Sequence, residues 1–182
     1  MKKTMKNIKN LCDSANLDFD VISKASKEIL SLYRQVYWEL ESKISFSFYE
    51  NKENTKLTSE TACIFLSKFS PTDVKKHFNS KTLNILETKL LLLIIYDACD
   101  RLKSFPNYGE IYYQIIYNYY ISDPKHNDEY SMRKLLIGRS IYYQRKKEAT
   151  ILLGIIIWGY SIPTAISLLK DGINVDDLLK IS

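Results

Sequence analysis

A run of basic residues near the carboxyl end holds the side chains best suited to chemistry on a partner. Residues 133–147 contain six cations and no acid, whereas the whole 182-residue chain has a formal net charge of +5. The remaining residues therefore carry −1, the difference between +5 and +6. A nearly neutral body with one concentrated basic segment indicates an anionic partner bound at a defined place.

The sequence around this basic window has the pattern of a helix-turn-helix. Residues 128–136 predict a helix of about two turns. Its inward-facing side chains are expected to be Met132, Leu135 and Leu136. Gly138 is the expected left-handed turn residue and Ser140 the expected cap of the next helix. That next helix reads SIYYQRKKEATILLGIIIWG, so it would project a basic amino end and anchor an apolar carboxyl end.

Such a helix has the character of a recognition helix, which enters the major groove of DNA with its early residues against base edges. Arginine can bind guanine, and glutamine adenine, through two hydrogen bonds worth ~1 to 3 kcal/mol of discrimination. We expect base contacts from Arg139, Tyr143, Gln144 and Lys147, and phosphate contacts from the lysines at 146 and 147. The full set of expected DNA-binding residues is Arg133, Lys134, Arg139, Ser140, Tyr143, Gln144, Arg145, Lys146 and Lys147.

Three stretches of the chain resemble a known family. They are Tyr33-Arg34, FPNYGEIYYQII at residues 105–116, and above all RSIYYQRKKEATILLGIIIWGYSIP at residues 139–163. Over residues 87–163 the chain resembles small phage-type regulators of low-GC Gram-positive bacteria, similar to the ArpU-like regulators. The resemblance implies a carboxyl-terminal module like region four of a sigma factor and a role in transcriptional control. Thr150 departs from the pattern, which has an aliphatic residue there.

Several amphipathic segments predict a helical body that would position this module. Apolar residues recur every three or four positions from Val21 onward, with Asp18 or Asp20 as cap and an end near Ile44. Residues 83–102 are so densely apolar that they predict a central helix. Apolar and aromatic residues also alternate along residues 110–121. This pattern could indicate a strand, but we favour a helix. Shorter helices are expected at residues 58–69 and 71–78, after a polar loop at residues 50–56.

These patterns predict an all-α fold, with a multi-helix body and a carboxyl-terminal helix-turn-helix module. Hydrophobic residues make up 46% of the chain and only 4 Pro and 5 Gly interrupt it, which excludes a disordered chain and one built of many short strands. The turn-rich residues 123–127 mark the expected boundary. Residues 1–122 would form a helical support or partner-binding body, and residues 123–182 the DNA-binding module with a helical extension.

The sequence offers little for catalysis or for a cofactor. His77 and His126 are isolated and lack metal-ligand spacing. Asp97 and Asp100, with Arg101 beside them, fit the solvent-exposed face of a helix better than a catalytic acid pair. No phosphate-binding glycine loop, HExxH or GxSxG motif occurs in the sequence. We therefore expect no enzyme activity, no catalytic residue, no cofactor and no metal.

Cysteine usage and hydropathy favour a soluble, cytoplasmic protein. Cys12, Cys63 and Cys99 are odd in number and widely spaced, unlike a disulfide framework or a zinc site. The basic amino terminus is followed by acidic residues where a secretion signal needs an apolar core. The most apolar runs, residues 90–95 and 151–158, are well short of the ~20 residues of a membrane span. We expect no membrane as partner.

Two functional hypotheses follow. The first is a sequence-specific, double-stranded DNA-binding transcriptional regulator of phage or mobile-element type. The alternative is a non-enzymatic accessory factor that binds RNA polymerase or a phage packaging component, with the basic helix in an acidic protein groove. RNA polymerase and a second copy of the chain stay open as further partners of a regulator. A basic helix face that merely faces solvent is the simplest competing explanation.

The aromatic residues have structural explanations of their own. The 14 tyrosines are scattered over the chain, which suits the edges of helical cores better than base stacking on single strands. We expect Tyr142 to be buried and Tyr143 to cover its edge. Trp158 and its apolar neighbours fit domain core better than a dimer contact.

Overall fold

The computed structural model describes residues 2–46 and 85–170, and these are helical, with no strand among them. The predicted all-α class is therefore confirmed for the described part of the chain. The elements are α1 (Lys2–Ser14), α2 (Phe19–Phe46), α5 (Ile85–Lys103), α6 (Gly109–Ile116), the π-helix η1 (Tyr117–Ile121), α7 (Asp128–Leu135), α8 (Arg139–Ile156), the π-helix η2 (Ile157–Ser161) and α9 (Ile162–Lys170). The expected loop and helices at residues 50–78 lie outside the described residues.

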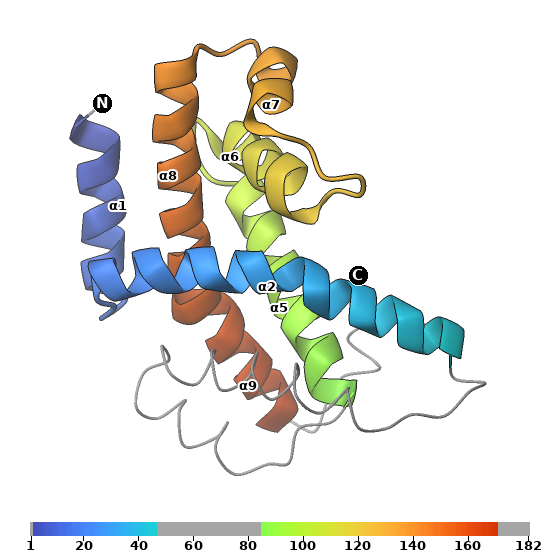
Figure 1. The fold of residues 1–182 in the computed structure, drawn as a ribbon. Helices are drawn as coiled ribbons and strands as arrows, with labels where there is room; N and C mark the ends of the chain where they lie inside the picture. The colour runs from blue at the N-terminus through green and yellow to red at the C-terminus, as the bar shows by residue number, and fades with distance from the viewer. Residues whose placement is uncertain (1, 47–84, 171–182) are drawn as a thin grey trace.

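Helix α8 is the axis around which the other helices are arranged. Figure 1 shows α1 beside α8 and α2 crossing both, with α9 continuing the line of α8 below the crossing. Helix α8 contacts α1, α2, α5 and α6. Every residue from Glu148 to Ile156 is buried, and Trp158 in η2 is only 1% exposed. The predicted anchoring of the apolar carboxyl end, with Trp158 in the core, is confirmed.

One hydrophobic cluster joins these helices, with members from both sides of the 123–127 turn region. Fully burying a large aliphatic side chain contributes roughly 1.5 to 3 kcal/mol, so this cluster is the main source of stability. The division into a body and a DNA-binding module stays a prediction. The helix running from Arg139 to Ala165 is long and apolar enough to cross a membrane, but 72% of its apolar window is buried inside the fold, as in a core helix.

Helix α2 begins as expected, and Ala25 and Ile29 of its predicted apolar face are buried. The carboxylate of Asp18 accepts a hydrogen bond from the backbone N–H of Val21 at 2.9 Å, which confirms the predicted cap. Val21 itself is 42% exposed, and the buried stripe starts one residue later, at Ile22. Helix α1 was not predicted, although Ile8 and Cys12 on one of its faces are fully buried in the core.

The segment at residues 110–121 is helical, as we favoured, and changes from α-helix to π-helix at Tyr117. Arg34 of α2 reaches the end of the π-helix and donates hydrogen bonds to the carbonyls of Tyr120 and Ser122. These carbonyls are the unsatisfied acceptors that every helix end leaves, so Arg34 ties α2 to η1.

Helices α2 and α8 cross closely at Gly154. A Cβ at this position would overlap the hydroxyl of Ser26 and lie 2.8 Å from Cγ2 of Ile22. The Ser26 hydroxyl is already held by a 2.6 Å hydrogen bond to the carbonyl of Ile22. Glycine is therefore required here by space, although it is a poor helix former.

We expect Gly154→Ala to destabilise the protein by roughly 1 to 3 kcal/mol, because the added methyl overpacks the crossing of α2 and α8. Urea denaturation of the wild type and the variant measures this. Adding Ser26→Gly should recover part of the loss, since it removes the nearest obstacle. A Gly154→Ala protein that is more stable than the wild type would show that helix propensity, and not space, governs this position.

Candidate nucleic-acid interface

Helices α7 and α8 are joined by a turn of three residues, 136–138, so the expected pair of helices is present. The side chain of Asn127 caps α7 by accepting a hydrogen bond from the N–H of Tyr130 at 2.8 Å. At the other end, Ile137 N–H donates to the carbonyl of Met132, and Leu136 N–H to that of Arg133. These two bonds form a Schellman motif. That the pair acts as a DNA-binding helix-turn-helix stays a prediction.

Three details of the predicted turn are wrong. Leu136 is the left-handed residue, with φ 53° and ψ 39°, because it occupies the C′ position of the Schellman motif. Gly138 has φ −70° and ψ 156°, and it takes the N-cap position of α8 that Ser140 was expected to fill. Leu136 was also expected to face inward but is 91% exposed. Met132 and Leu135 are partly buried.

The first turns of α8 present an exposed polar face. Arg139, Ser140, Tyr143 and Lys147 are all exposed, and positions 140, 143 and 147 share one side of a helix. Tyr142 points the other way and is fully buried, while Tyr143 is 44% exposed, as predicted for this pair. The Arg139 guanidinium lies 5.9 Å from the centre of the Tyr143 ring.

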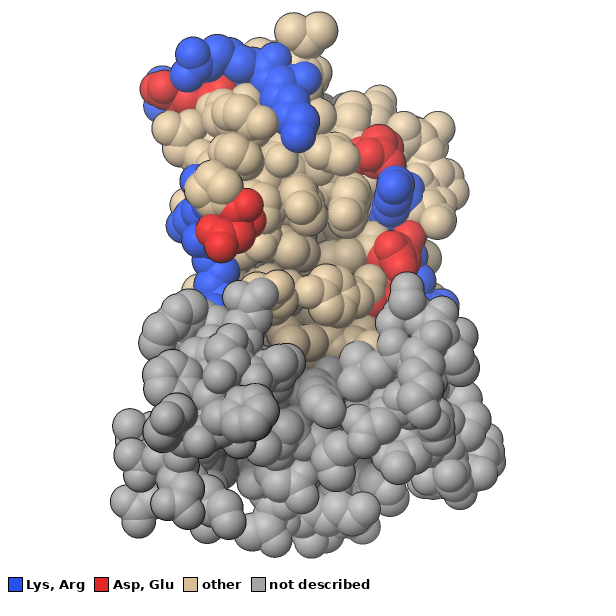
Figure 2. Space-filling view, turned by 90° about the vertical axis from the view of Figure 1, so that its right-hand side faces the viewer, with Lys and Arg blue, Asp and Glu red and all other residues tan. Residues whose placement is uncertain are grey.

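Two further cations of the window are exposed on α7. The Arg133 side chain is 80% exposed and lies 3.8 Å from Glu129, itself 75% exposed. An ion pair this open to water contributes little, so Arg133 can exchange it for another anion. Lys134 is exposed and lies over the ring of Tyr130, 5.8 Å from its centre. Figure 2 shows basic side chains gathered at the α7 end of the molecule.

Two other predicted contacts, Gln144 and Arg145, are engaged inside the fold by Glu148. This carboxylate is 0% exposed and accepts hydrogen bonds from Gln144 Nε2 at 2.8 Å and Arg145 Nη1 at 2.7 Å. The hydroxyl of Tyr112 donates a third bond at 2.9 Å. The Arg145 guanidinium also stacks on Tyr108, 3.5 Å from the ring centre. The buried carboxylate thus has three donors, one of which is a cation.

Contact with Glu148 shifts the pKa values of Arg145 and Tyr112. Burial opposes a charged guanidinium, but the bond and charge of Glu148 outweigh burial and raise the pKa of Arg145. Burial, with the neighbouring Glu148 carboxylate, raises the pKa of Tyr112, so its hydroxyl keeps its proton and serves as a donor.

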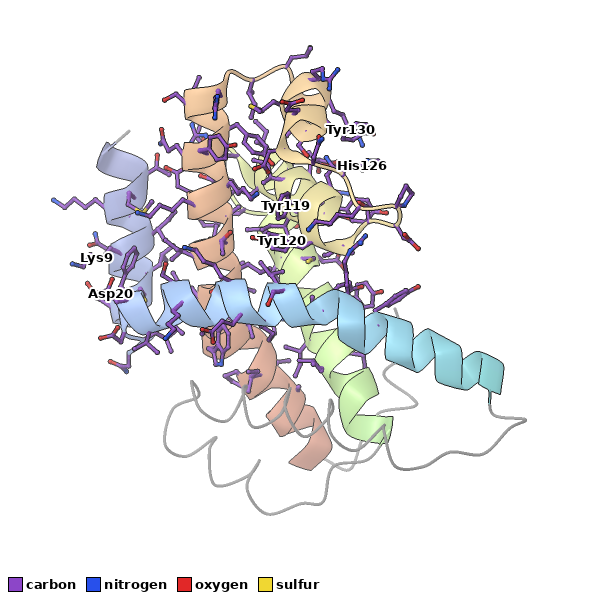
Figure 3. All side chains as sticks on the ribbon, in the orientation of Figure 1. Lys9, Asp20, Tyr119, Tyr120, His126 and Tyr130 are labelled. Carbon is purple, nitrogen blue, oxygen red and sulfur yellow. The ribbon has the colours of Figure 1, made fainter. Side chains whose placement is uncertain are left out.

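Lys146 is likewise engaged internally and joins α8 to α7. Its Nζ lies 2.6 Å from Oδ1 of Asp128, and their side chains are 15% and 23% exposed. The ammonium sits over the Tyr119 ring, 3.1 Å from its centre, and the Tyr142 hydroxyl donates to the same Asp128 oxygen at 2.8 Å. Burial alone would raise the pKa of Asp128, but the bonds from Lys146 and Tyr142 lower it. Tyr119 and Tyr120 belong to the π-helix η1, which lies beside α8 (Figure 3).

The basic window thus divides into an exposed set and an internal set. The exposed set is Arg133, Lys134, Arg139, Ser140, Tyr143 and Lys147, and the internal set is Gln144, Arg145 and Lys146. The acids that hold the internal set were missed because they lie just outside the window, at positions 128 and 148. Residues 128–148 contain six cations and three acids, a net charge of +3. The helical spacing of Glu148 from Gln144 and Arg145 could have revealed one of them.

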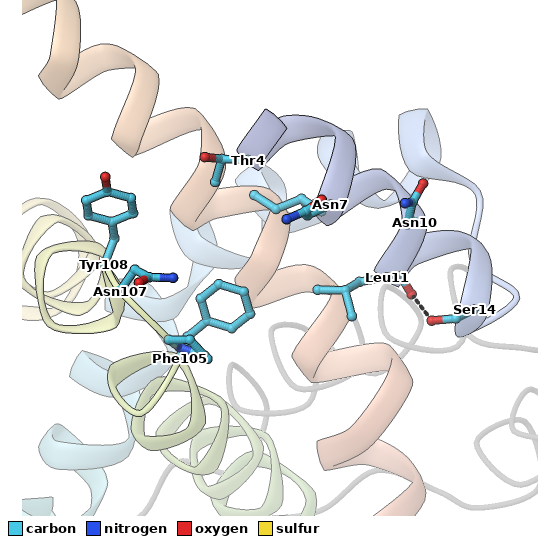
Figure 4. A pocket seen from close by; sticks show the side chains of 10 residues that line it. Thr4, Asn7, Asn10, Leu11, Ser14, Phe105, Asn107 and Tyr108 are labelled. Carbon is cyan, nitrogen blue, oxygen red and sulfur yellow. Dashed lines mark hydrogen bonds between the residues drawn. The ribbon is translucent and has the colours of Figure 1, made fainter. Parts of the chain in front are cut away.

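A cleft of about 610 Å³ between α1 and the α5–α6 turn is a second candidate site. Figure 4 shows its rim, with Asn7 and Asn10 on α1 and Asn107 on the turn, and a Ser14 hydroxyl bound to the Leu11 carbonyl at 2.9 Å. The residues that line it include no acid, histidine, lysine or arginine. Of the groups that general acid–base chemistry uses, this lining offers only the hydroxyl of Tyr108.

Neither buried cysteine that the structure describes is set up as a nucleophile. Burial, with the Asp100 carboxylate nearby, raises the pKa of Cys99 to about 12, so its reactive thiolate is scarce at neutral pH. Within residues 2–46 and 85–170, no three His, Cys, Asp or Glu side chains are grouped to hold a metal ion. Asp97 pairs with Arg101 at 2.8 Å on an open helix face, as the sequence indicated.

Comparisons with protein-family models, with curated proteins and with solved structures find no match to this chain. The resemblance to phage-type regulators therefore depends on the sequence motifs alone.

We expect Arg145→Ala to lower the free energy of unfolding by roughly 3 to 5 kcal/mol, because it leaves the buried Glu148 carboxylate without its cation. Arg139→Ala, the matched control on the exposed face, should change it by less than about 0.5 kcal/mol. Denaturant titration at pH 7 compares the two. Combining Arg145→Met with Glu148→Gln should recover part of the loss, and equal losses for Arg145→Ala and Arg139→Ala would contradict the division into two sets.

Proposed function

We propose that this chain is a sequence-specific, double-stranded DNA-binding transcriptional regulator that meets DNA with the α7–α8 end of the molecule. The observation that carries the proposal is the exposed face of Arg139, Ser140, Tyr143 and Lys147 on the first turns of a helix whose last turns are core. A helix anchored in this way presents its amino end rigidly. Recognition helices present themselves to the major groove in the same way.

The exposed residues supply both kinds of DNA contact. Arg139 and Ser140 stand in the first turn of α8, where an arginine can bind the O6 and N7 atoms of guanine and a serine can bond several base edges. Arg133, Lys134 and Lys147 have the flexible charged side chains that bind phosphates and fix the orientation of the protein. The unpaired N–H groups at the start of α8 favour phosphate as well.

The internal residues have a supporting part in this proposal. Lys146 fixes α7 against α8 through Asp128, and Arg145 fixes the exposed face against α6 through Glu148 and Tyr112. Gln144 would have to leave Glu148 to bind adenine directly. We therefore assign base reading to Arg139, with Tyr143 beside it, and assign orientation of the helix to Gln144, Arg145 and Lys146.

The wider role comes from the sequence. The resemblance of residues 139–163 to phage-type regulators supports transcriptional control, and the odd, unpatterned cysteines support a cytoplasmic location. RNA polymerase and a second copy of the chain are open as further partners. No enzyme activity, cofactor or membrane forms part of the proposal. The alternative, an accessory factor whose basic end enters an acidic protein groove, predicts that the protein ignores duplex DNA.

The test is selection of a bound site from a pool of random DNA duplexes, followed by affinity measurements across a salt series. One sequence should be enriched. If the three exposed cations assigned to phosphates, Arg133, Lys134 and Lys147, each neutralise one phosphate, the logarithm of the binding constant should fall with the logarithm of salt with a slope of about −2.7. Arg139→Ala should weaken binding to the selected site roughly 5- to 150-fold, the range expected for one bidentate base contact.

Lys27→Ala is the matched control, because Lys27 is an exposed cation on α2, outside the α7–α8 end. It should leave the affinity for the selected site unchanged. Absence of any enriched site, or binding that ignores salt, would refute the DNA proposal. A protein partner that the Arg139→Ala variant still retains would then favour the accessory-factor alternative.

A further inference from the structure

Leu136 combines two features that an aliphatic residue seldom shows together. It is 91% exposed, and its backbone is left-handed, with φ 53°. The other described residues with positive φ outside glycine are Asn16 and Asn107, whose side-chain type tolerates this conformation. For leucine the left-handed conformation is unfavourable, because Cβ comes too close to the following carbonyl oxygen.

Among the described residues, the side chain of Leu136 makes no buried contact that would favour leucine in this conformation. The exposed side chain of Leu136 buries almost no apolar surface, so it gains little hydrophobic stabilisation. A glycine would form the same Schellman motif without strain. The glycine of the turn stands instead at position 138, where φ is ordinary and an added Cβ would meet nothing within 4 Å. The turn thus holds leucine outward at the tip where glycine would fold better.

The surroundings of Leu136 limit what its side chain can meet. Arg133, Lys134 and Arg139 lie within three residues of it along the chain and are all exposed. Ile141, in the first turn of α8, adds a second aliphatic side chain that is 52% exposed. A partner must therefore be anionic around its edge and apolar at its centre.

Duplex DNA offers this combination in the major groove, where phosphates line the edges and the 5-methyl group of thymine projects from the floor. The groove is about 12 Å wide, which admits a helix of about 10 to 12 Å diameter by its amino end. A lipid surface is the other anionic and apolar partner. It fits less well, because membrane-surface helices bury a continuous apolar face and this end has two separate aliphatic side chains among polar ones.

We propose that Leu136 contacts a thymine methyl group in the major groove and makes the protein select thymine at that position. The inference rests on the proposed function, because it names a base that the same surface reads. Leu136 is then a specificity-determining residue at the tip of the turn, and the strained conformation aims its side chain at the DNA.

The experiment replaces each thymine of the selected duplex in turn by deoxyuridine, which removes only the 5-methyl group. At one position this should weaken binding of the wild type about fourfold, as expected when one buried methyl is lost. Leu136→Gly should bind the unmodified duplex more weakly and lose its sensitivity to that replacement. Val21→Ala, which changes an exposed aliphatic residue on α2, should keep the full sensitivity.

Thermal unfolding of the same proteins separates binding from folding. Leu136→Gly should have a Tm at least equal to that of the wild type, because glycine relieves the left-handed strain. The inference is overturned if both proteins bind duplex DNA with normal salt dependence and deoxyuridine weakens the wild type and Leu136→Gly equally. The proposed function would then still stand. If the wild type binds no duplex DNA at all, both this inference and the proposed function are overturned. If the protein binds phosphatidylglycerol vesicles through Leu136 and deoxyuridine does not weaken DNA binding, the partner of Leu136 is a lipid surface and not DNA.

Discussion

The fold depends on a buried carboxylate in the middle of its central helix. Glu148 is fully enclosed, so it needs a cation and several donors, and Arg145, Gln144 and Tyr112 supply them. This requirement fixes α8 against α6. It also marks the level on α8 where core gives way to surface, since residues after Glu148 are buried and the exposed polar face ends just before it, at Lys147.

Charge counting along the sequence therefore overstated what the basic window offers a partner. Arg145 and Lys146 are held by Glu148 and Asp128, and these ion pairs orient the helix. The internal set holds in place the helices that carry the exposed cations. These are Arg139 and Lys147 on α8 and Arg133 and Lys134 on α7. In the proposed function, the internal set holds the amino end of α8 in place and the exposed set contacts DNA.

Periodicity predicted much of the fold and little of the local geometry. The densely apolar residues at 83–102 and the apolar end of α8 gave the central helices correctly, because burial follows directly from such patterns. The prediction of the turn was wrong because a glycine at position 138 favoured the left-handed assignment there. Helix α7 instead ends at Leu135, and the Schellman hydrogen bonds put Leu136 in the left-handed conformation. Helix α1 was missed since its few buried residues lie in a polar, lysine-rich segment. Asp128 acts through contacts with Tyr142 and Lys146 on the next helix, and Glu148 also bonds Tyr112, 36 residues away, so local periodicity does not show these partners.

The central claim is that the basic segment has an outward set that binds DNA and an inward set that holds the fold. Nuclear magnetic resonance of the arginine guanidinium groups, with and without the selected duplex, tests it most directly. The account predicts that DNA shifts the Arg139 resonances and leaves those of Arg145 where the Glu148 bond already holds them. Shifts at Arg145 with none at Arg139 would contradict it.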